Sequence, residues 1–368
     1  MKDGIILLNK PQNWTSADCV AVCRKALGIS GSRKKSGDKR KIGHGGTLDP
    51  MATGLLPIFV GQATRIMEYL ELDYKTYRCT ALLGIRTDTQ DIWGERIDTP
   101  SDMAEGLTES TVRNALMSFE GYIEQIPPMY SAVRVDGKRL YDYAHKGREI
   151  DAEKIKPRPV HIQKIEIEDI KLFDPDEKAG EQPGIGRVTF TCCCSKGTYI
   201  RTICADLGEK LGCGATMQSL ERIAIGVLNL EQKCTISTWH ELSISPEQVK
   251  TMSAEEIEAR MVPADYPLVH LGCCEISEER AVYYSRGNEI WWTQAKVLSE
   301  PDIPESAQKQ TGNCAGSGEG DVPRNARGRA YDCIYRVYEA GTGEFLGTGF
   351  YDKEKNKMLA DKVFTASR

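Results

Sequence analysis

The sequence predicts an α+β fold followed by a small β-rich domain. Strand-like and helix-like segments both occur within the first 260 residues. From about Tyr266 onward the recognisable elements are short strand-like runs. The chain has 368 residues, of which 40% are hydrophobic and 27% charged, and this composition fits one large or two globular domains.

The N-terminal elements follow from apolar runs and the residues that bound them. Residues 4–9 are predicted to form a buried strand. Ser16 is predicted to cap a helix over residues 17–27, which Gly28 ends. Residues 30–41 are polar and strongly basic, so we expect a mobile loop that either contacts a phosphate backbone or is disordered.

The middle of the chain holds further strands and helices. Strands are predicted over residues 77–85 and 187–194, and helices over residues 109–119 and 198–211. The first of these helices is expected to be capped by Ser110 or Thr111. Residues 122–158 show no clean period, and residues 174–186 read as a surface loop.

Three strand-like runs stand out near the C-terminal end, at residues 289–292, 331–338 and 345–351. Between the first two, residues 299–329 are rich in Ser, Gly, Pro and Gln and have no apolar pattern. Such a composition cannot bury enough surface to order itself, so we expect disorder or a long surface insertion there.

The composition argues against a membrane or secreted protein. No apolar stretch approaches the ~20 residues that a membrane span needs, and Pro11 interrupts the short N-terminal apolar run. The 13 cysteines include no C-x-x-C pair, and adjacent Cys192, Cys193 and Cys194 would alternate between the faces of a strand. We therefore expect a cytoplasmic protein with reduced thiols and no metal site.

Charge is unevenly distributed along the chain. The net charge is −5, yet residues 1–41 hold ten Lys/Arg against three Asp, which is +7, and residues 231–330 hold ten Lys/Arg against sixteen Asp/Glu, which is −6. A positive N-terminal segment can meet phosphate groups while the far half stays acidic. Ordinary solvated surface charge is the alternative.

Residues 43–61, GHGGTLDPMATGLLPIFVG, present a single carboxylate in a Gly/Thr-rich turn. Pro50 biases Asp49 toward an extended backbone, so the chain cannot continue smoothly into a helix there. A carboxylate presented in this way can act as a nucleophile that forms a covalent intermediate. On the short pattern alone, a turn or a helix N-cap explains Asp49 as well.

Three further blocks carry residues suited to nucleic acid chemistry. Tyr77 lies beside Lys75 and Arg78, an arrangement suited to stacking on a base near its phosphate, or else it is a core residue of a strand. In residues 125–148, basic side chains are interspersed with tyrosines. This suits either a segment that binds folded RNA or a flap packed on its own protein. Arg201 opens a predicted helix, where the helix dipole disfavours a cation, so we expect a carboxylate partner.

The 43–61 block resembles the catalytic motif of TruB-type tRNA pseudouridine synthases, and residues 73–94, 125–148 and 194–226 resemble further blocks of that family. Residues 335–364 resemble the PUA-type β-barrel that such proteins append. Three departures stand out: Gly45 replaces a usual Thr, and the segments 30–41 and 299–329 are longer than expected.

The resemblance implies a fold and a domain division. The fold is α+β, with a mixed, mainly antiparallel sheet, flanking helices and a small C-terminal PUA-like β-barrel. The catalytic domain would span residues 1–260, with a thumb-like RNA-binding insertion at about 122–158. The PUA-like domain would span residues 265–368 and contain the insertion at about 299–329.

The resemblance also implies an activity: isomerisation of uridine to pseudouridine at position 55 in the T-loop of tRNA, after the base is flipped out. No cofactor, metal, membrane or obligate protein partner is expected, and the partner is the tRNA T-arm stem-loop. Asp49 would be the nucleophile and Arg201 its ion-pair partner. The target base would be held or exposed by His44, Tyr77, Tyr199 and Leu220.

Several alternatives stay open. Asp49 attacks either the sugar C1′ or uracil C6, and the group that removes the C5 proton is Tyr77 or another weak base. The rival functions are a non-catalytic tRNA-binding or tRNA-folding protein, a guide-RNA-dependent rRNA pseudouridine synthase and, more remotely, a hydrolase with a single carboxylate. The last would release uracil instead of an isomer of unchanged mass.

Overall fold

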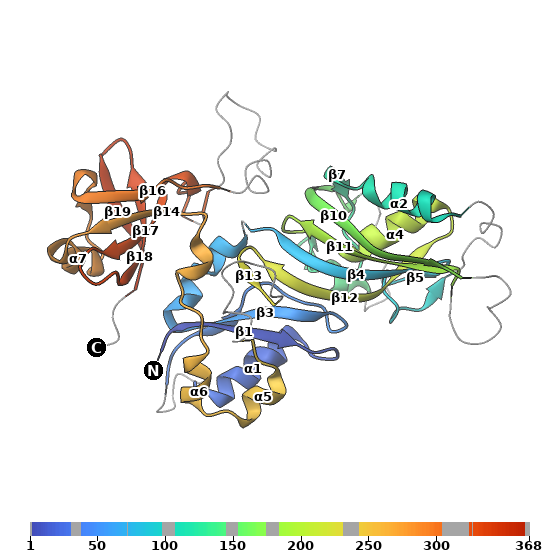
Figure 1. Cartoon of the computed structure of the whole chain (residues 1–368), viewed down its shortest axis with the longest axis horizontal. Coiled ribbons are helices and arrows are strands. Elements are labelled where there is room, and N and C mark those ends of the chain that lie inside the picture. Colours follow the sequence, from blue (N-terminus) through green and yellow to red (C-terminus); the bar gives the residue numbers. More distant parts are fainter. Residues whose placement is uncertain are drawn as a thin grey trace. The chain divides into compact units, whose positions relative to one another are not determined.

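The computed structural model describes residues 2–30, 38–71, 73–97, 107–144, 154–173, 184–230, 243–303, 324–325 and 327–364 (Figure 1). The chain divides into two compact units. The first comprises residues 1–50, 54–74 and 224–368, and the second comprises residues 51–53 and 75–223. Among the described helices, none is both long and apolar enough to cross a membrane.

The first unit is built on the strand β1 (Gly4–Lys10), which pairs antiparallel with β3 (Thr53–Val60). A short strand, β2 (Ile42–His44), also pairs antiparallel with β3. The residues of β1 from Gly4 to Leu8 are all buried, as expected of a strand covered on both faces. The prediction of a buried strand at residues 4–9 is therefore confirmed.

Helices pack on β1. α1 (Ser16–Ala26) and α5 (Pro246–Thr251) contact each other and β1, and α6 (Ala254–Ala259) follows α5 (Figure 1). The 3-10 helix η1 (Gly61–Glu71) also contacts β1. One apolar cluster joins Ile5 and Leu7 of β1 to Ile66 and Tyr69 of η1.

The predicted helix caps were wrong by one to three positions. Thr15, not Ser16, caps α1, and its side chain accepts a hydrogen bond from the backbone N–H of Asp18 at 3.1 Å. Thr108 caps α2 (Glu109–Met117) in the same way, with Thr111 as its partner. A cap residue needs extended backbone angles and a partner three residues on, and Thr15 and Thr108 meet both conditions.

The second unit is a largely antiparallel sheet with two helices. Its strand order is β12 (Ala215–Ile225), β4 (Lys75–Leu83), β11 (Gly186–Cys194), β10 (Arg158–Leu172) and β7 (Gly121–Gln125). α2 and α4 (Ile200–Leu211) contact each other, and Gly212 ends α4 with a left-handed backbone. The predicted strands at 77–85 and 187–194 and the helices at 109–119 and 198–211 are thus confirmed. In β11, Cys192 and Cys194 are buried and Cys193 is partly exposed, as the alternation predicts.

The predicted thumb insertion contains more regular structure than its composition indicated. After β7, β8 (Arg134–Val135) and β9 (Lys138–Arg139) form a hairpin that leads into α3 (Leu140–Ala144). The two loop residues, Asp136 and Gly137, both have positive φ, which matches the twist of a two-residue hairpin. A second small ribbon joins β5 (Arg86–Thr87) to β6 (Arg96–Ile97).

The C-terminal part of the first unit is a six-stranded sheet. Its order is β15 (Ile290–Trp291), β19 (Lys357–Val363), β18 (Phe345–Asp352), β17 (Ile334–Glu339), β14 (Gly272–Ile276) and β16 (Ala295–Ser299). α7 (Glu278–Ser285) packs on β15, β17, β18 and β19. The minor elements are β13 (Leu228–Asn229), η5 (Tyr266–Leu268), η6 (Trp292–Gln294) and η7 (Tyr331–Cys333). The predicted α+β class with a small PUA-like β-barrel is confirmed.

A buried carboxylate ties the C-terminal sheet to η1. Asp361 of β19 accepts hydrogen bonds from Tyr69 of η1 at 2.6 Å and from Arg329 at 2.7 Å, and it lies 3.3 Å from Arg327. The pKa of the Tyr69 phenol is raised by burial and by this carboxylate, so Tyr69 stays a hydrogen-bond donor. Leu268, Tyr331 and Ile334 belong to the same apolar cluster as β1 and η1.

Parts of three predicted loops lie outside the described residues. These are residues 31–37 of the basic loop, residues 174–183 of the predicted surface loop, and residues 304–323 with 326 of the long insertion. In the described part of the basic loop, Asp38 forms a parallel β-bridge with Ile29, which lies just before the loop.

Candidate active site

Asp49 is flanked by two anchored residues. On one side, the backbone N–H of Leu48 donates to Ser16 Oγ at 3.0 Å, and that hydroxyl donates to the Leu48 carbonyl at 3.2 Å. On the other side, the Pro50 carbonyl accepts from the backbone N–H of Asn13 at 2.9 Å. Asp49 itself is partly exposed. The turn is therefore fixed through the neighbours of the predicted nucleophile.

A buried lysine completes this anchor. Lys10 has no exposed surface, and its Nζ donates to the carbonyls of Trp14 at 2.7 Å, Pro11 at 3.1 Å and Pro50 at 3.3 Å. A buried ammonium is tolerated only when its donors are used, and here three carbonyls accept them. Lys10 thus joins the end of β1 to the residue that follows Asp49.

Packing explains why Gly45 departs from the family motif. Gly45 is buried, and its N–H donates to the Pro57 carbonyl at 2.8 Å. A Cβ at Gly45 would lie 2.6 Å from the ring of Phe59. Phe59 therefore occupies the space that a threonine at position 45 would need.

His44 ends β2, opposite Ile58 of β3, and is partly buried. His44 and Asp49 both belong to the first compact unit. The short path between them contains Gly45, Gly46 and Thr47, of which Gly46 has positive φ. Both residues thus lie in the Gly-rich segment 43–61 that the sequence analysis singled out.

The other predicted site residues belong to the second unit. Tyr77 lies on β4, opposite Cys192 of β11, and is partly exposed. Leu220 lies on β12, and its carbonyl accepts a hydrogen bond from Thr53 Oγ1 at 3.4 Å. Leu220 is 9% exposed, so it can present only a small apolar surface.

Tyr199 is fixed by a glutamine that the sequence analysis did not single out. The backbone N–H of Tyr199 donates to Gln125 Oε1 at 2.7 Å, and Gln125 Nε2 donates to the Tyr199 carbonyl at 3.0 Å. Gln125 is buried at the end of β7. These two hydrogen bonds fix the start of α4, whose N-cap residue makes no side-chain cap bond. They use only the backbone of Tyr199, so its ring takes no part in them.

Arg201 is buried at the start of α4, and its guanidinium is held by the second unit itself. Nη1 donates to the Thr89 carbonyl at 3.2 Å and lies 3.7 Å from the Asp91 carboxylate, while Nη2 donates to the Tyr130 carbonyl at 3.0 Å. The expected carboxylate partner thus exists within this unit, and it is Asp91. A pairing of Arg201 with Asp49 stays a prediction.

The turn that holds Arg201 is itself tied to the sheet. The Asp91 carboxylate accepts from the Trp93 N–H at 3.1 Å and from Thr89 Oγ1 at 2.9 Å. Gln90, which has positive φ, accepts from the Met217 N–H of β12 at 3.1 Å. Residues 87–91, noted in the sequence only as part of a family block, therefore position the arginine.

The predicted thumb carries exposed cations. Arg134, Lys138 and Arg139 of the β8–β9 hairpin are exposed, and Arg139 donates to the Tyr141 hydroxyl at 2.9 Å. The pKa of Tyr130 is raised by burial and by Asp88, whose carboxylate accepts its hydroxyl at 3.4 Å. The remaining predicted thumb cations, Lys146 and Arg148, lie outside the described residues.

Nothing in the described part of the chain forms a cluster of three or more His, Cys, Asp or Glu suited to a metal. The described cysteines are free thiols. Burial raises the pKa of Cys19 to about 11 and that of Cys23 to about 12, so these side chains stay protonated at neutral pH.

Two family models match this chain. The model described as TruB family pseudouridylate synthase (N terminal domain) matches residues 33–200, which contain Asp49, Tyr77 and Tyr199. The model described as tRNA pseudouridylate synthase B C-terminal domain matches residues 201–269. The chain belongs to the TruB family of pseudouridylate synthases. As a member of the TruB family it is an enzyme, an isomerase, as predicted.

Curated TruB relatives cover most of the chain. The tRNA pseudouridine synthase B of Syntrophus aciditrophicus (strain SB) is 39% identical over 306 residues, covering 83% of this chain and 85% of that protein. The protein of the same name from Burkholderia pseudomallei (strain 668) is 35% identical, covering 83% of this chain and 88% of that protein.

A solved structure shares the fold at low identity. It is the crystal structure of the archaeal box H/ACA sRNP Nop10-Cbf5 complex, with a TM-score of 0.60, 20% identity, and coverage of 98% of this chain and 86% of that chain. The likeness supports the same architecture for this TruB-family chain.

Proposed function

We propose that this chain converts uridine 55 in the T-loop of tRNA to pseudouridine, with Asp49 as the nucleophile. The observation that carries the proposal is the anchored turn. Ser16 and Lys10 fix the backbone on both sides of Asp49, which is itself partly exposed, and a nucleophile has to be positioned in this way. The curated relatives are named for activity on tRNA.

The reaction begins when the target uracil leaves its stack, which costs a few kcal/mol. In the proposal, His44 helps to open the loop that the base vacates. Tyr77 stacks on the extruded ring, and Tyr199 and Leu220 line its pocket. Tyr199 suits this role because Gln125 fixes its backbone through two hydrogen bonds.

Asp49 then attacks the sugar C1′ or uracil C6. The C1′–N1 bond breaks, the uracil turns, and a C1′–C5 bond forms. The covalent bond between Asp49 and C1′ or C6 is also broken, which returns the Asp49 carboxylate. The proton on C5 is lost to a weak base, for which Tyr77 is the candidate, while N1 gains a proton. The product is an isomer of the substrate, so the balance requires no oxidant, reductant or second substrate.

Arg201 would orient the Asp49 carboxylate and balance its charge. An unperturbed aspartate has a pKa near 3.9 and is already ionised at neutral pH, so ionisation needs no help. The guanidinium suits this role because Asp91, Thr89 and Tyr130 fix its position. We further propose residues 1–260 as the catalytic domain and residues 265–368 as an RNA-binding domain.

The test uses Asp49→Asn and tRNA labelled with tritium at uridine C5. We expect wild type to release tritium and the variant to release none, while both bind tRNA with similar affinity. Tritium release by the variant would overturn the role of Asp49. Mapping of modified uridines after the reaction should place the product at position 55.

Two further measurements address the rival functions. Turnover on a bare T-arm stem-loop, with no protein or guide RNA, excludes a guide-dependent enzyme. A product of unchanged mass excludes a hydrolase, which would release free uracil. Binding without turnover by the wild-type protein would identify a non-catalytic tRNA-binding protein instead.

A further inference from the structure

A basic hollow lies beside β2, immediately before His44. Its volume is about 440 Å³, within the range of small-ligand sites. The lining holds four cationic side chains, two hydroxyl-bearing residues and no carboxylate. The residues that line it are Arg24, Ile29, Ser30, Lys39, Arg40, Lys41, Ile42, Gly43, Thr64 and Met67.

The walls of this hollow are tied together by backbone hydrogen bonds. The Ser30 N–H donates to the Asp38 carbonyl at 2.7 Å, which joins the segment after α1 to the segment before β2. The Gly61 N–H donates to the Lys41 carbonyl at 2.7 Å, which joins that segment to η1. The cations are thus presented on a connected frame of three elements.

One of the four cations has a structural role. Arg40 Nε donates to Asp38 at 2.7 Å, and its Nη2 donates to Glu258 at 3.0 Å. These carboxylates hold the guanidinium from outside the lining. Arg40 is therefore held in place by carboxylates, and its charge is largely compensated.

The other three cations are not compensated within the described part of the chain. Arg24, Lys39 and Lys41 have no carboxylate within ion-pair distance there. Lys39 and Lys41 are exposed on either side of the more buried Arg40. Three like charges around one hollow repel one another, and a bound polyanion would relieve that repulsion.

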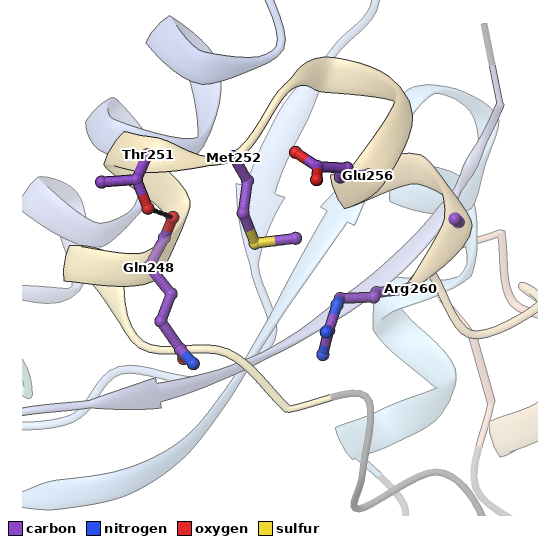
Figure 2. Close-up of a pocket in the computed structure, with 6 residues that line it drawn as sticks. Gln248, Thr251, Met252, Glu256 and Arg260 are labelled. Carbon is purple, nitrogen blue, oxygen red and sulfur yellow. Dashed lines mark hydrogen bonds between the residues drawn. The ribbon is translucent and has the colours of Figure 1, made fainter.

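Two other hollows in the first unit lack this imbalance. The hollow between α5 and α6, shown in Figure 2, has a volume of about 380 Å³ and is lined by one cation, Arg260, and one carboxylate, Glu256. The hollow beside the start of α1, of about 430 Å³, is lined by Lys25 and Asp18. Surplus positive charge thus distinguishes the hollow beside β2.

We propose that the hollow beside β2 binds backbone phosphates of the RNA substrate, through Arg24, Lys39 and Lys41. The proposal rests on the proposed function, since it assigns the polyanion to the RNA whose uridine meets Asp49. Only Ile42 and Gly43 separate Lys41 from His44. A phosphate bound here therefore lies beside the segment that leads into the catalytic turn.

The test compares two triple variants that remove the same charge. The first is Arg24→Gln/Lys39→Gln/Lys41→Gln. The control, Lys25→Gln/Lys164→Gln/Lys171→Gln, takes its charges from exposed positions outside the hollow and outside the proposed RNA-binding domain. Circular dichroism and thermal unfolding establish that both variants fold. The readouts are the Kd for a T-arm stem-loop at several salt concentrations, and the KM and kcat for pseudouridine formation.

We expect the first variant to raise Kd and KM about 10- to 100-fold at 0.15 M salt, with kcat at saturating RNA changed by less than about threefold. The slope of log Kd against log salt should fall by about 2 to 3, because three phosphate contacts are lost. The control should shift Kd by no more than a few-fold, through net charge alone.

The outcomes separate this proposal from the proposed function. Equal Kd values and equal salt slopes for the two triple variants would overturn the phosphate site. If the first triple variant loses binding of inorganic pyrophosphate but binds RNA as wild type does, the hollow is a site for a small anion. That result would also overturn the proposed site for RNA phosphates. Wild type that binds the stem-loop but forms no pseudouridine would overturn only the function.

Discussion

The Asp49 turn and the Arg201 site are positioned in opposite ways. The turn is fixed through the backbones of Leu48 and Pro50, by Ser16 and Lys10. Arg201 is fixed through its own guanidinium, which contacts Asp91 and two carbonyls. A nucleophile must keep its carboxylate available for the substrate, whereas an orienting cation works best when its head group is already fixed.

The largest effect should come from Arg201→Gln, which breaks a buried pair and leaves Asp91 uncompensated. We expect a loss of about 3–5 kcal/mol in the free energy of unfolding and at least a 100-fold drop in kcat. Denaturant unfolding and single-turnover kinetics measure the two effects. Arg78→Gln is the control in the same unit, because its partners Glu168 and Glu221 have 37% of their side-chain surface exposed, and it should cost no more than about 1 kcal/mol.

Lys10→Met tests the other anchor. The substitution keeps most of the apolar stem but removes a hydrogen bond from three carbonyls, of which Pro50 keeps its bond from the Asn13 N–H. We therefore expect a loss of about 2–4 kcal/mol in the free energy of unfolding. Chemical denaturation measures this loss, with Lys25→Met as the control. A loss no greater than that of the control would show that Lys10 does not anchor the turn.

Ser16→Ala and Thr15→Ala separate positioning from stability. Each removes one hydroxyl, and each should cost about 1 kcal/mol in the free energy of unfolding. Only Ser16→Ala should also lower kcat, by about tenfold, because only Ser16 holds Leu48 beside the nucleophile. Equal kcat values for the two variants would contradict the proposed anchor.

Gly45→Thr should destabilise the turn by about 1–3 kcal/mol, because its Cβ would meet the Phe59 ring. In a Phe59→Val background the same Gly45→Thr change should cost less, because the smaller side chain makes room for the threonine. The measurement is a double-mutant cycle of thermal unfolding. Additive losses would show that the two positions are not coupled.

The smallest effect concerns pH. The folded pKa values of Cys19 and Cys23, about 11 and 12, lie above the unfolded value of 9.0. The stability from these protonated thiols is therefore fully present below pH 9 and is lost as pH rises through 9 toward 12. Replacing both by Ala should flatten the decline of unfolding free energy above pH 9, and urea titrations between pH 7 and 10.5 measure that slope.

The sequence was sufficient to predict the strands and helices that have strong apolar patterns. β1, β4, β11 and α4 were predicted within two residues at each end because their periodicity is clean and glycines bound several of them. β3 was missed, since Pro57 lies inside it. Pro57 lies opposite Leu7 of β1, and although it has no N–H to donate, its carbonyl still accepts a hydrogen bond from the Gly45 N–H.

The chemistry of the site was only partly predictable. Asp49, Tyr77 and Arg201 could be named from their motif, but their supports could not. Gln125, Asp91 and Lys10 act through backbone groups that are distant in sequence, and a single chain carries no signal for such pairings. Lys10 offered one clue, a charged residue at the end of an apolar run.

The shared core of the first unit has a consequence for synthesis in the cell. Ile5 and Tyr69 emerge from the ribosome early, but their partners Tyr331 and Ile334 follow roughly 260 residues after η1. At typical translation rates of about 5–20 residues per second, that interval is about 13 to 52 s. During this time the part of the first-unit core that these late segments complete stays open to water.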